Sequence, residues 1–196
     1  MQRKANLTLH LGRKGSGKSW AAKKLAFAHK GRVWVWDPRA EWAGPVAADA
    51  RGEYSIVRDL PSWLDAAKHS KLQPPKRIAF QCRHEDFELW CKLVSLTGNG
   101  LFIVDEAHLY ASRSPSRALV ELVRVCRHAR ADLLLVAQRP AGLCPDIRSQ
   151  VDSMRCWQFT EPRDLAWIAD IAGESFSLGL QRLRNHASVI WNPSKP

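Results

Sequence analysis

The sequence has no long hydrophobic run, and its N-terminus lacks the features of a secretory signal. None of its apolar runs approaches the ~18 residues that a membrane-spanning helix needs. The first residues show no apolar core followed by a small-residue cleavage site. These absences predict a cytoplasmic protein without an integral membrane segment.

Paired cysteines are missing as well. The five cysteines are odd in number, lie far apart and include no CxxC pair. Zinc sites and disulfide frameworks need closely spaced or paired cysteines, so neither is indicated. We expect reduced and mostly buried thiols.

Acidic residues are absent from residues 1–32, which carry nine basic side chains. The whole chain has 30 Lys and Arg against 19 Asp and Glu, a formal net charge of +11. Five further arginines gather between residues 113 and 130. Such an excess predicts a polyanionic partner, either nucleic acid or the phosphates of a nucleotide.

Short apolar runs alternate with helical stretches along the chain. We expect strands at 6–11, 32–37, 54–57, 77–82, 101–106, 132–138, 154–160 and 187–191. We expect helices at 18–30, 60–70, 85–97, 115–129 and 162–172. This alternation predicts one α/β domain over residues 1–196, with a mainly parallel central sheet, helices on both faces, a long loop at 37–53 and a loose tail at about 192–196.

The stretch "GRKGSGKS" fits the phosphate-binding P-loop pattern G-x-x-x-x-G-K-[ST], between an expected strand and an expected helix. Glycines let successive backbone N–H groups turn toward an anion, and the helix N-terminus adds positive potential. Lys18 is expected to reach the β- and γ-phosphates of a nucleoside triphosphate, and Ser19 to bind Mg²⁺. The expected nucleotide-binding residues are Gly12, Arg13, Lys14, Gly15, Ser16, Gly17, Lys18, Ser19 and Trp20.

Two carboxylates follow another apolar run, in "LFIVDEAH". A buried strand would deliver Asp105 and Glu106 at the edge where α/β sheets bind their ligands. Asp105 is the candidate magnesium ligand, directly or through water, and Glu106 is the candidate base that activates water. This adjacency favours hydrolysis over a phosphotransferase that must exclude water.

The run "DLLLVAQRP" ends a third apolar strand in Gln138. A neutral amide at that point could sense the γ-phosphate. As the third member of the set, Gln138 places its strand beside the Asp105 strand, between that strand and the P-loop strand. Asp37 also ends a strand, and a structural cap is favoured for it over a role near the magnesium.

Together, "GRKGSGKS", "IVDEAH", "RHARADLLLVAQRP" and "SQVDSMRCWQFTEPRDLAWI" resemble the FtsK–HerA superfamily of DNA-pumping ATPases, and among them the small genome-packaging ATPases of tailless, membrane-containing viruses. The resemblance implies a three-layer RecA-like (ASCE) P-loop NTPase fold, ATP and Mg²⁺ as cofactors, and a pentameric or hexameric ring around double-stranded DNA. It also implies an arginine that reaches the neighbouring subunit's ATP. Arg127 lies at the matching position, and Arg130 is the alternative.

The expected helix at 115–129, with Ser114 as its cap, gathers arginines on the face opposite its apolar stripe. Glu121 is the one acid on that side, which favours phosphates or a subunit interface over intramolecular pairing. The loops 111–117 and 139–149 are candidate DNA contacts, through Arg113, Arg139 and Arg148. Trp20 and Trp42 flank the nucleotide region, where packing is favoured over stacking on a base.

The sequence therefore predicts a ring-forming, Mg²⁺-dependent ATPase that moves double-stranded DNA into a viral procapsid, in the host cytoplasm or at a packaging vertex, with a capsid vertex protein as a candidate partner. Two alternatives stay open. One is a virion-export ATPase of the filamentous-phage or zonula-occludens-toxin kind, against which the lack of a membrane segment counts. The other is an assembly switch with negligible turnover, against which Glu106 counts.

Overall fold

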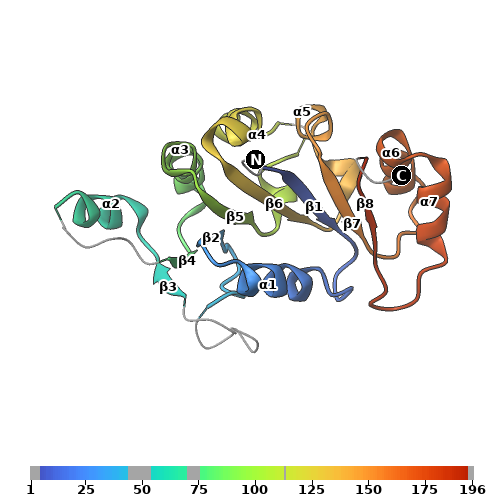
Figure 1. Ribbon diagram of the computed structural model, residues 1–196, viewed down its shortest axis with the longest axis horizontal. Helices are drawn as coiled ribbons and strands as arrows, with labels where there is room; N and C mark the ends of the chain where they lie inside the picture. Colours follow the sequence, from blue (N-terminus) through green and yellow to red (C-terminus); the bar gives the residue numbers. More distant parts are fainter. Residues whose placement is uncertain (1–4, 44–53, 70–75, 113, 194–196) are drawn as a thin grey trace.

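The computed structural model describes residues 5–43, 54–69, 76–112 and 114–193. Within these residues it forms an eight-stranded sheet in the order β3-β4-β2-β5-β6-β1-β7-β8. All neighbouring strands pair in parallel except β7 and β8. The predicted α/β class with a mainly parallel sheet is confirmed. The sheet separates α1 on one face from α3, α4 and α5 on the other, as Figure 1 shows.

The elements follow the predicted alternation. The strands are β1 (Leu7–Leu11), β2 (Arg32–Trp36), β3 (Ser55–Val57), β4 (Arg77–Phe80), β5 (Gly100–Val104), β6 (Ala131–Ala137), β7 (Ser153–Cys156) and β8 (Val189–Trp191). The α-helices are α1 (Lys18–Ala28), α2 (Leu60–His69), α3 (Phe87–Thr97), α4 (Arg117–Ala129), α5 (Pro145–Arg148), α6 (Pro162–Ala172) and α7 (Glu174–Gln181). Short 3₁₀ turns lie at His84–Asp86, Ala107–Leu109 and Pro140–Gly142.

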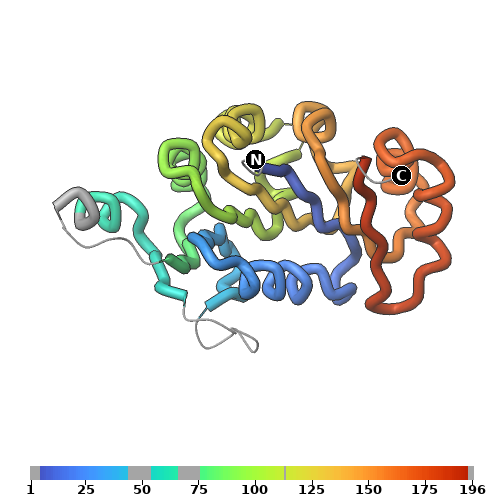
Figure 2. Tube along the Cα trace, viewed as in Figure 1, coloured from blue at the N-terminus to red at the C-terminus, as the bar shows by residue number. Residues whose placement is uncertain are grey.

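The N-terminal strand β1 lies in the interior of the sheet, between β6 and β7 (Figure 2). Leu7 pairs with Leu133 of β6, and Thr8 pairs with Ser153 of β7. As predicted, β6 separates the P-loop strand β1 from β5, which leads to Asp105. Because these strands are parallel, β1, β5 and β6 end at one edge of the sheet. We call this the carboxyl edge and the opposite one the amino edge.

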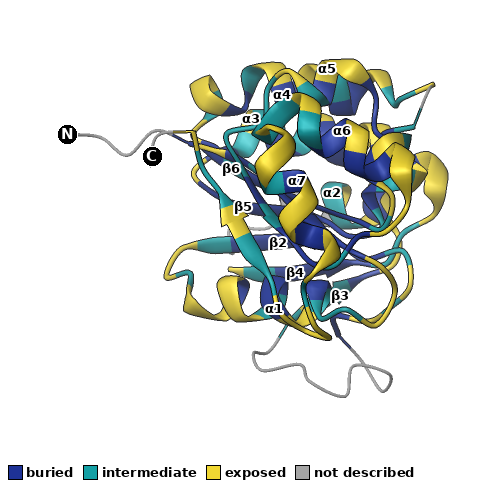
Figure 3. Cartoon of the chain, turned by 90° about the vertical axis from the view of Figure 1, so that its right-hand side faces the viewer, coloured by how far each residue is buried: buried dark blue, intermediate teal, exposed yellow. Residues whose placement is uncertain are grey.

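Side-chain alternation along the strands builds a core on each face of the sheet. Trp34 and Trp36 of β2 belong to the larger core with α3 and α4, whereas Val33 and Val35 pack with the alanines of α1. The strands are mostly buried and the outer faces of the helices are exposed (Figure 3). The four tryptophans Trp34, Trp36, Trp42 and Trp90 are each at most 1% exposed. The sheet is thus a well-packed support for the residues at its carboxyl edge.

Several local predictions were wrong. The helix expected from 85 begins at Phe87, after a 3₁₀ turn. The expected cap Ser114 is not the cap of α4, since Ser116 accepts the Leu119 N–H at 3.1 Å. The helices α5 and α7 were not predicted, because their four and eight residues are too short to show a clear period. Residues 44–53 of the loop expected at 37–53, and the last three residues of the expected tail, lie outside the described residues.

No helix among the described residues is both long and apolar enough to cross a lipid bilayer.

Candidate functional site

The loop "GRKGSGKS" connects β1 to α1, and its glycines are required by its geometry. Gly15 has φ +76° and Gly17 has φ +101°, values that side-chain-bearing residues rarely adopt. At Gly12, an added Cβ would lie 2.7 Å from the Ser16 Oγ and 2.8 Å from the Trp157 Cβ. The chain therefore folds as a tight cradle whose N–H groups precede a helix N-terminus.

Lys18, the first residue of α1, is only 7% exposed. Its Nζ donates to the Arg13 carbonyl oxygen at 2.8 Å and so folds back over the loop. Burial lowers the pKa of Lys18, and the nearby carboxylates of Glu106 and Asp105 act in the opposite direction. A buried ammonium beside a loop of N–H donors is a site for an anion, because a phosphate would restore the solvation that the cation lacks.

A second feature of the loop fits a phosphate group. The Ser16 Oγ is buried, and within the described part of the chain it has no hydrogen-bond partner. A buried hydroxyl without a partner is costly, and a ligand oxygen would satisfy it. The glycine cradle, Lys18 and Ser16 together fit a nucleoside triphosphate.

Asp105 follows β5 directly and is 6% exposed. Its Oδ1 accepts the backbone N–H of Glu106 at 2.9 Å, and its Oδ2 accepts the indole N–H of Trp42 at 2.7 Å. Burial raises the pKa of Asp105 to about 6, although both hydrogen bonds oppose the shift. Because the hydrogen-bond donors to Asp105 among the described residues are neutral, binding a cation would stabilise its charged form.

Glu106 stands in the left-handed region of backbone conformation, with φ 50° and ψ 41°. Such a conformation is unusual for a residue other than glycine, and residues that adopt it cluster at functional sites. Its carboxylate is 15% exposed and accepts the Gln138 Nε2 at 3.1 and 3.0 Å. The Arg39 Nε lies 3.1 Å from Oε1, and the His108 Nδ1 lies 3.3 Å from Oε2.

The structure thus brings together four side chains predicted from the sequence, namely Lys18, Asp105, Glu106 and Gln138. Asp105 and Glu106 follow β5, Gln138 follows β6, and Lys18 begins α1 after the loop that follows β1, all at the carboxyl edge of the sheet. Ser19 stands beside Lys18 in the first turn of α1. No cluster of three or more His, Cys, Asp or Glu side chains that could hold a metal occurs in the described residues. A divalent cation here would need ligands from Ser19, Asp105 and the nucleotide itself.

Asp37 has a structural role, as favoured from the sequence. It is 1% exposed and accepts the backbone N–H groups of Glu41 and Trp42 at 2.9 and 3.1 Å. The Gln81 Nε2 also donates to Asp37 at 2.9 Å and to the Ala43 carbonyl oxygen at 2.9 Å. Asp37 therefore fixes the loop that carries Arg39 and Trp42 toward the site.

Two cavities adjoin the P-loop on the side of the segment before β8. One, of about 230 Å³, is lined by Arg13, Lys14, Gly15, Ser16, Trp157, Gln158, Arg184, Asn185 and His186. The other, of about 220 Å³, is lined by Gly17, Trp20, Ala21, Arg155, Trp157, His186 and Ser188. Trp20 is 52% exposed, and the Lys24 Nζ lies 3.6 Å from the centre of its ring. The two cavities share Trp157 and His186, neither of which was predicted as a site residue.

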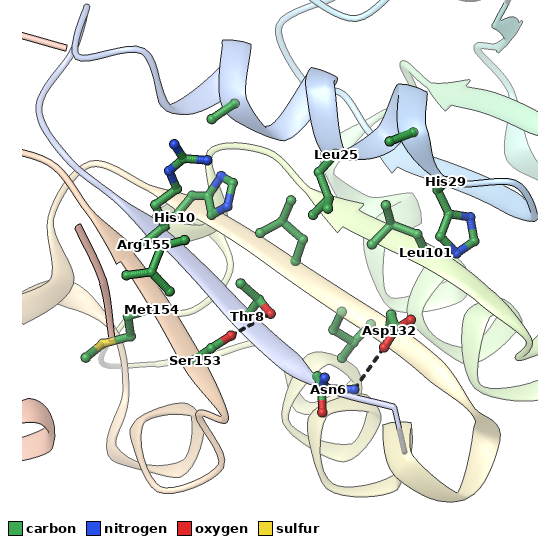
Figure 4. A pocket seen from close by; sticks show the side chains of 15 residues that line it. Asn6, Thr8, His10, Leu25, His29, Leu101, Asp132, Ser153, Met154 and Arg155 are labelled. Atoms are coloured by element: carbon green, nitrogen blue, oxygen red, sulfur yellow. Dashed lines mark hydrogen bonds between the residues drawn. The ribbon is translucent and has the colours of Figure 1, made fainter. Parts of the chain in front are cut away.

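A larger cavity, of about 370 Å³, lies between α1 and the sheet and belongs to a different region (Figure 4). Its floor includes Thr8 and Ser153, whose hydroxyls lie 3.0 Å apart, and the buried His10. Burial, with a further contribution from the nearby Arg155, lowers the pKa of His10 to about 4. On this part of its α1 face the sheet leaves a cavity in which these polar side chains lie among apolar ones such as Leu25 and Leu134.

The arginines of α4 contradict the expectation that they avoid intramolecular pairing. Arg124 Nη2 lies 2.8 Å from Asp146 Oδ1, and Arg127 Nη2 lies 2.6 Å from Asp152 Oδ1. Both acids come from segments outside α4, so the helix sequence alone did not reveal them. Arg127 lies near the start of β6, at the amino edge of the sheet and away from the P-loop of its own chain.

The candidate DNA contacts are also tied to acids. Arg139 Nε lies 2.9 Å from Asp164 Oδ2, a carboxylate that is 2% exposed, and Arg148 Nη1 lies 2.8 Å from Asp170 Oδ2. The side chains of Arg139 and Arg148 remain 59% and 38% exposed. Arg113 lies outside the described residues.

Three residues contact the predicted carboxylates without having been predicted to do so, namely Arg39, His108 and Trp42, although Trp42 was placed near the nucleotide. Arg39 and Trp42 both belong to "DPRAEW" after β2. Asp37 at the carboxyl end of a strand was the available signal, because the residues that follow it must also lie at the carboxyl edge.

Solved structures that share this fold include the genome packaging NTPase B204 from Sulfolobus turreted icosahedral virus 2 in complex with AMPPCP. It matches with a TM-score of 0.78 and 22% sequence identity, over 96% of this chain and 93% of that chain. VirB4 of Thermoanaerobacter pseudethanolicus matches with a TM-score of 0.66 and 12% identity, over 97% and 87%. The pCW3 conjugation coupling protein TcpA, with ATPγS, matches with a TM-score of 0.60 and 13% identity, over 97% and 58%.

No protein-family model matches the chain, and none of the curated proteins matches it. At these identities the likeness to solved structures is one of fold. It confirms the predicted three-layer RecA-like P-loop NTPase fold. At the level of fold, it also confirms the predicted resemblance to genome-packaging ATPases.

Proposed function

We propose that the chain is a Mg²⁺-dependent ATPase motor that translocates double-stranded DNA and packages a viral genome into a procapsid. The observation that carries this proposal is the convergence of Lys18, Asp105, Glu106 and Gln138 at the carboxyl edge of the sheet. The fold shared with the packaging NTPase B204 supports genome packaging as the function of this ATPase.

In this proposal the P-loop N–H groups and Lys18 bind the triphosphate. Lys18 exchanges the Arg13 carbonyl oxygen, 2.8 Å away, for phosphate oxygens. The base and ribose occupy the cavities lined by Trp157, His186 and Trp20, which adjoin the same loop. The exposed rings of Trp20 and His186 would stack on a nucleobase, whereas Trp157, which is 2% exposed, forms the wall behind them. Arg13 and Lys14 at the cavity wall attract the phosphates.

Ser19 and Asp105 would hold Mg²⁺, whose chemistry when bound is to neutralise the charge that develops on the phosphate oxygens. Glu106 takes the proton of the attacking water. Gln138, whose amide donates to both Glu106 oxygens, orients that carboxylate and links its position to the loop after β6. Arg39 pairs with the same carboxylate at 3.1 Å, and the His108 Nδ1 lies 3.3 Å from its Oε2. These three side chains all contact the Glu106 carboxylate, so its orientation is fixed.

The proposed partners are double-stranded DNA, a capsid vertex protein and further copies of this chain. The net charge of +11 favours sequence-independent binding to DNA phosphates, with a steep dependence on salt. A ring of five or six subunits would bring Arg127 of one subunit to the ATP of its neighbour. To do so, Arg127 would exchange Asp152 for a phosphate.

The test compares phosphate release by the wild-type chain with that of Glu106→Gln and of Glu121→Gln, a carboxylate exchange on the outer side of α4. Removing a general base typically costs 10²–10⁴-fold in rate. We expect Glu106→Gln to lose hydrolysis by about that factor while it binds AMPPCP normally, and Glu121→Gln to resemble the wild type. We further expect the wild-type rate per subunit to rise with protein concentration and with duplex DNA. A wild-type rate in Glu106→Gln would reject Glu106 as the base.

A further inference from the structure

Trp42 differs from other buried tryptophans of this protein in the fate of its indole N–H. Trp42 is 1% exposed, and its Nε1 donates to Asp105 Oδ2 at 2.7 Å. Trp34 and Trp90 are equally buried, yet among the described residues their Nε1 atoms have no hydrogen-bond partner. The core thus tolerates an unpaired indole N–H, so packing alone does not require the bond that Trp42 makes.

A chain of hydrogen bonds fixes Trp42 in this position. Asp37 Oδ2 accepts the Trp42 backbone N–H, and Gln81 joins Asp37 to the Ala43 carbonyl oxygen. On the other side, the Lys23 Nζ donates to the Glu41 carbonyl oxygen at 2.7 Å and lies 5.9 Å from the centre of the Trp42 ring. Residues that follow β2 and β4, and Lys23 of α1, therefore hold Trp42 in place independently of its hydrogen bond to Asp105.

We propose that Trp42 is a positioning residue that fixes the carboxylate of Asp105 for Mg²⁺. This inference rests on the proposed function, since it needs a metal at Asp105. The Glu106 N–H holds Oδ1 and the Trp42 N–H holds Oδ2, so the plane of the carboxylate is set on both sides. Groups that orient a metal ligand from behind typically contribute 10–100-fold to metal affinity or activity.

The direct test is Trp42→Phe, which keeps an aromatic ring and removes the N–H, with Trp90→Phe as the matched control. Binding of Mn²⁺ in the presence of AMPPCP is followed by electron paramagnetic resonance, and the Mg²⁺ dependence of hydrolysis is measured alongside. We expect Trp42→Phe to weaken Mn²⁺ binding, and to raise the half-saturating Mg²⁺ concentration, by about tenfold. We expect unchanged AMPPCP affinity without metal. Trp90→Phe should match the wild type in all three measurements.

Metal binding by Trp42→Phe equal to that of the wild type would overturn the inference and leave the proposed function standing. A wild-type chain that neither binds Mn²⁺ with AMPPCP nor needs Mg²⁺ would instead overturn the metal site, and the inference with it. A loss of AMPPCP affinity without metal that equals the loss of metal binding would assign Trp42 to the general structure of the site, which also overturns the inference.

If Trp42→Phe does not fold, the wild-type chain decides the question. In a ¹⁵N correlation spectrum, the indole N–H of Trp42 is identified by its nuclear Overhauser effects to its neighbours. We expect this resonance to shift when Mg²⁺ is added to the AMPPCP complex, and those of Trp34 and Trp90 to remain in place. No shift at Trp42 would overturn the inference.

Discussion

The two edges of the sheet use the same residue types for different purposes. At the amino edge, Asp152 accepts the Arg127 guanidinium and the Leu7 backbone N–H, so it joins α4 to the start of β1 with its charge neutralised. At the carboxyl edge, the hydrogen bonds that Asp105 accepts from the described residues come from neutral N–H donors alone, and Asp105 is more deeply buried. The carboxylate at the amino edge is satisfied by the protein, whereas the one at the carboxyl edge is left for a cation from outside.

The difference shows how a site can be distinguished from a structural ion pair. A carboxylate that already pairs with an arginine is stabilised little further by a metal ion. If that arginine moves to a phosphate, the carboxylate is left without its ion-pair partner. A buried carboxylate that no cation contacts through a hydrogen bond carries a cost in the free protein that a ligand removes. The contrast between Asp105 and Asp152 can therefore be tested by changing each edge separately.

The largest effect is expected at the amino edge, on the rate of hydrolysis by Arg127→Ala under conditions in which the proposed ring would assemble. A trans-acting arginine contributes ~10³–10⁵ in rate, so hydrolysis should fall by at least about 10³-fold. Nucleotide binding by the single subunit should not change, and the stability cost should stay below about 1 kcal/mol because the pair is partly exposed. Arg124→Ala, which removes another paired arginine of α4, is the control.

Phosphate release at saturating protein concentration and an AMPPCP titration distinguish a role of Arg127 in hydrolysis from a structural role. Full activity of Arg127→Ala would show that the Arg127–Asp152 pair is structural. The same experiment on Arg130→Ala would then decide for the alternative arginine.

A smaller effect is expected on the pH dependence of the free energy of unfolding, through the charge of Asp105 in the absence of nucleotide and metal. Its pKa is raised to about 6 from a usual value of 3.8, because burial disfavours the charged form. The folded state therefore binds a proton that the unfolded state releases between these values. The stability gained from this proton is fully present below about pH 4 and is lost as the pH rises through about 6.

Asp105→Asn removes this dependence. Relative to the wild type, its free energy of unfolding should rise by on the order of 2 kcal/mol between pH 4 and pH 7. Urea denaturation in EDTA at several pH values measures the difference, with Glu121→Gln as an exposed control that should follow the wild type. A difference that does not vary with pH would mean that Asp105 is stably charged without a cation.

The smallest effect is expected from Arg148→Ala. Arg148 is paired with Asp170 at 2.8 Å, yet its side chain is 38% exposed. If it contacts one DNA phosphate, its loss should reduce the slope of log affinity against log salt by about 1, without changing nucleotide binding. Fluorescence anisotropy with duplex DNA at several salt concentrations measures the slope. Lys92→Ala, which removes one exposed charge from α3, is the control, and equal slopes for both variants would remove Arg148 from the DNA surface.

The parts of the structure that could be predicted from the sequence are those encoded by neighbouring residues. The P-loop lies within eight residues, and Asp105 follows its own strand directly, so strand order placed both at one edge. The contacts between distant residues could not be predicted. Trp42 and Asp105 are 63 positions apart, and a helix pattern around Arg127 contains no information about Asp152.

The contact that bears on the nucleotide most directly is the hydrogen bond from Lys18 Nζ to the Arg13 carbonyl oxygen. A crystal structure of the wild-type chain with AMPPCP and Mg²⁺ tests whether a triphosphate replaces it. We expect Lys18 to turn from Arg13 to the β- and γ-phosphates, with Mg²⁺ between Ser19 and Asp105. A nucleotide bound elsewhere, with Lys18 still on Arg13, would rule out the proposed site.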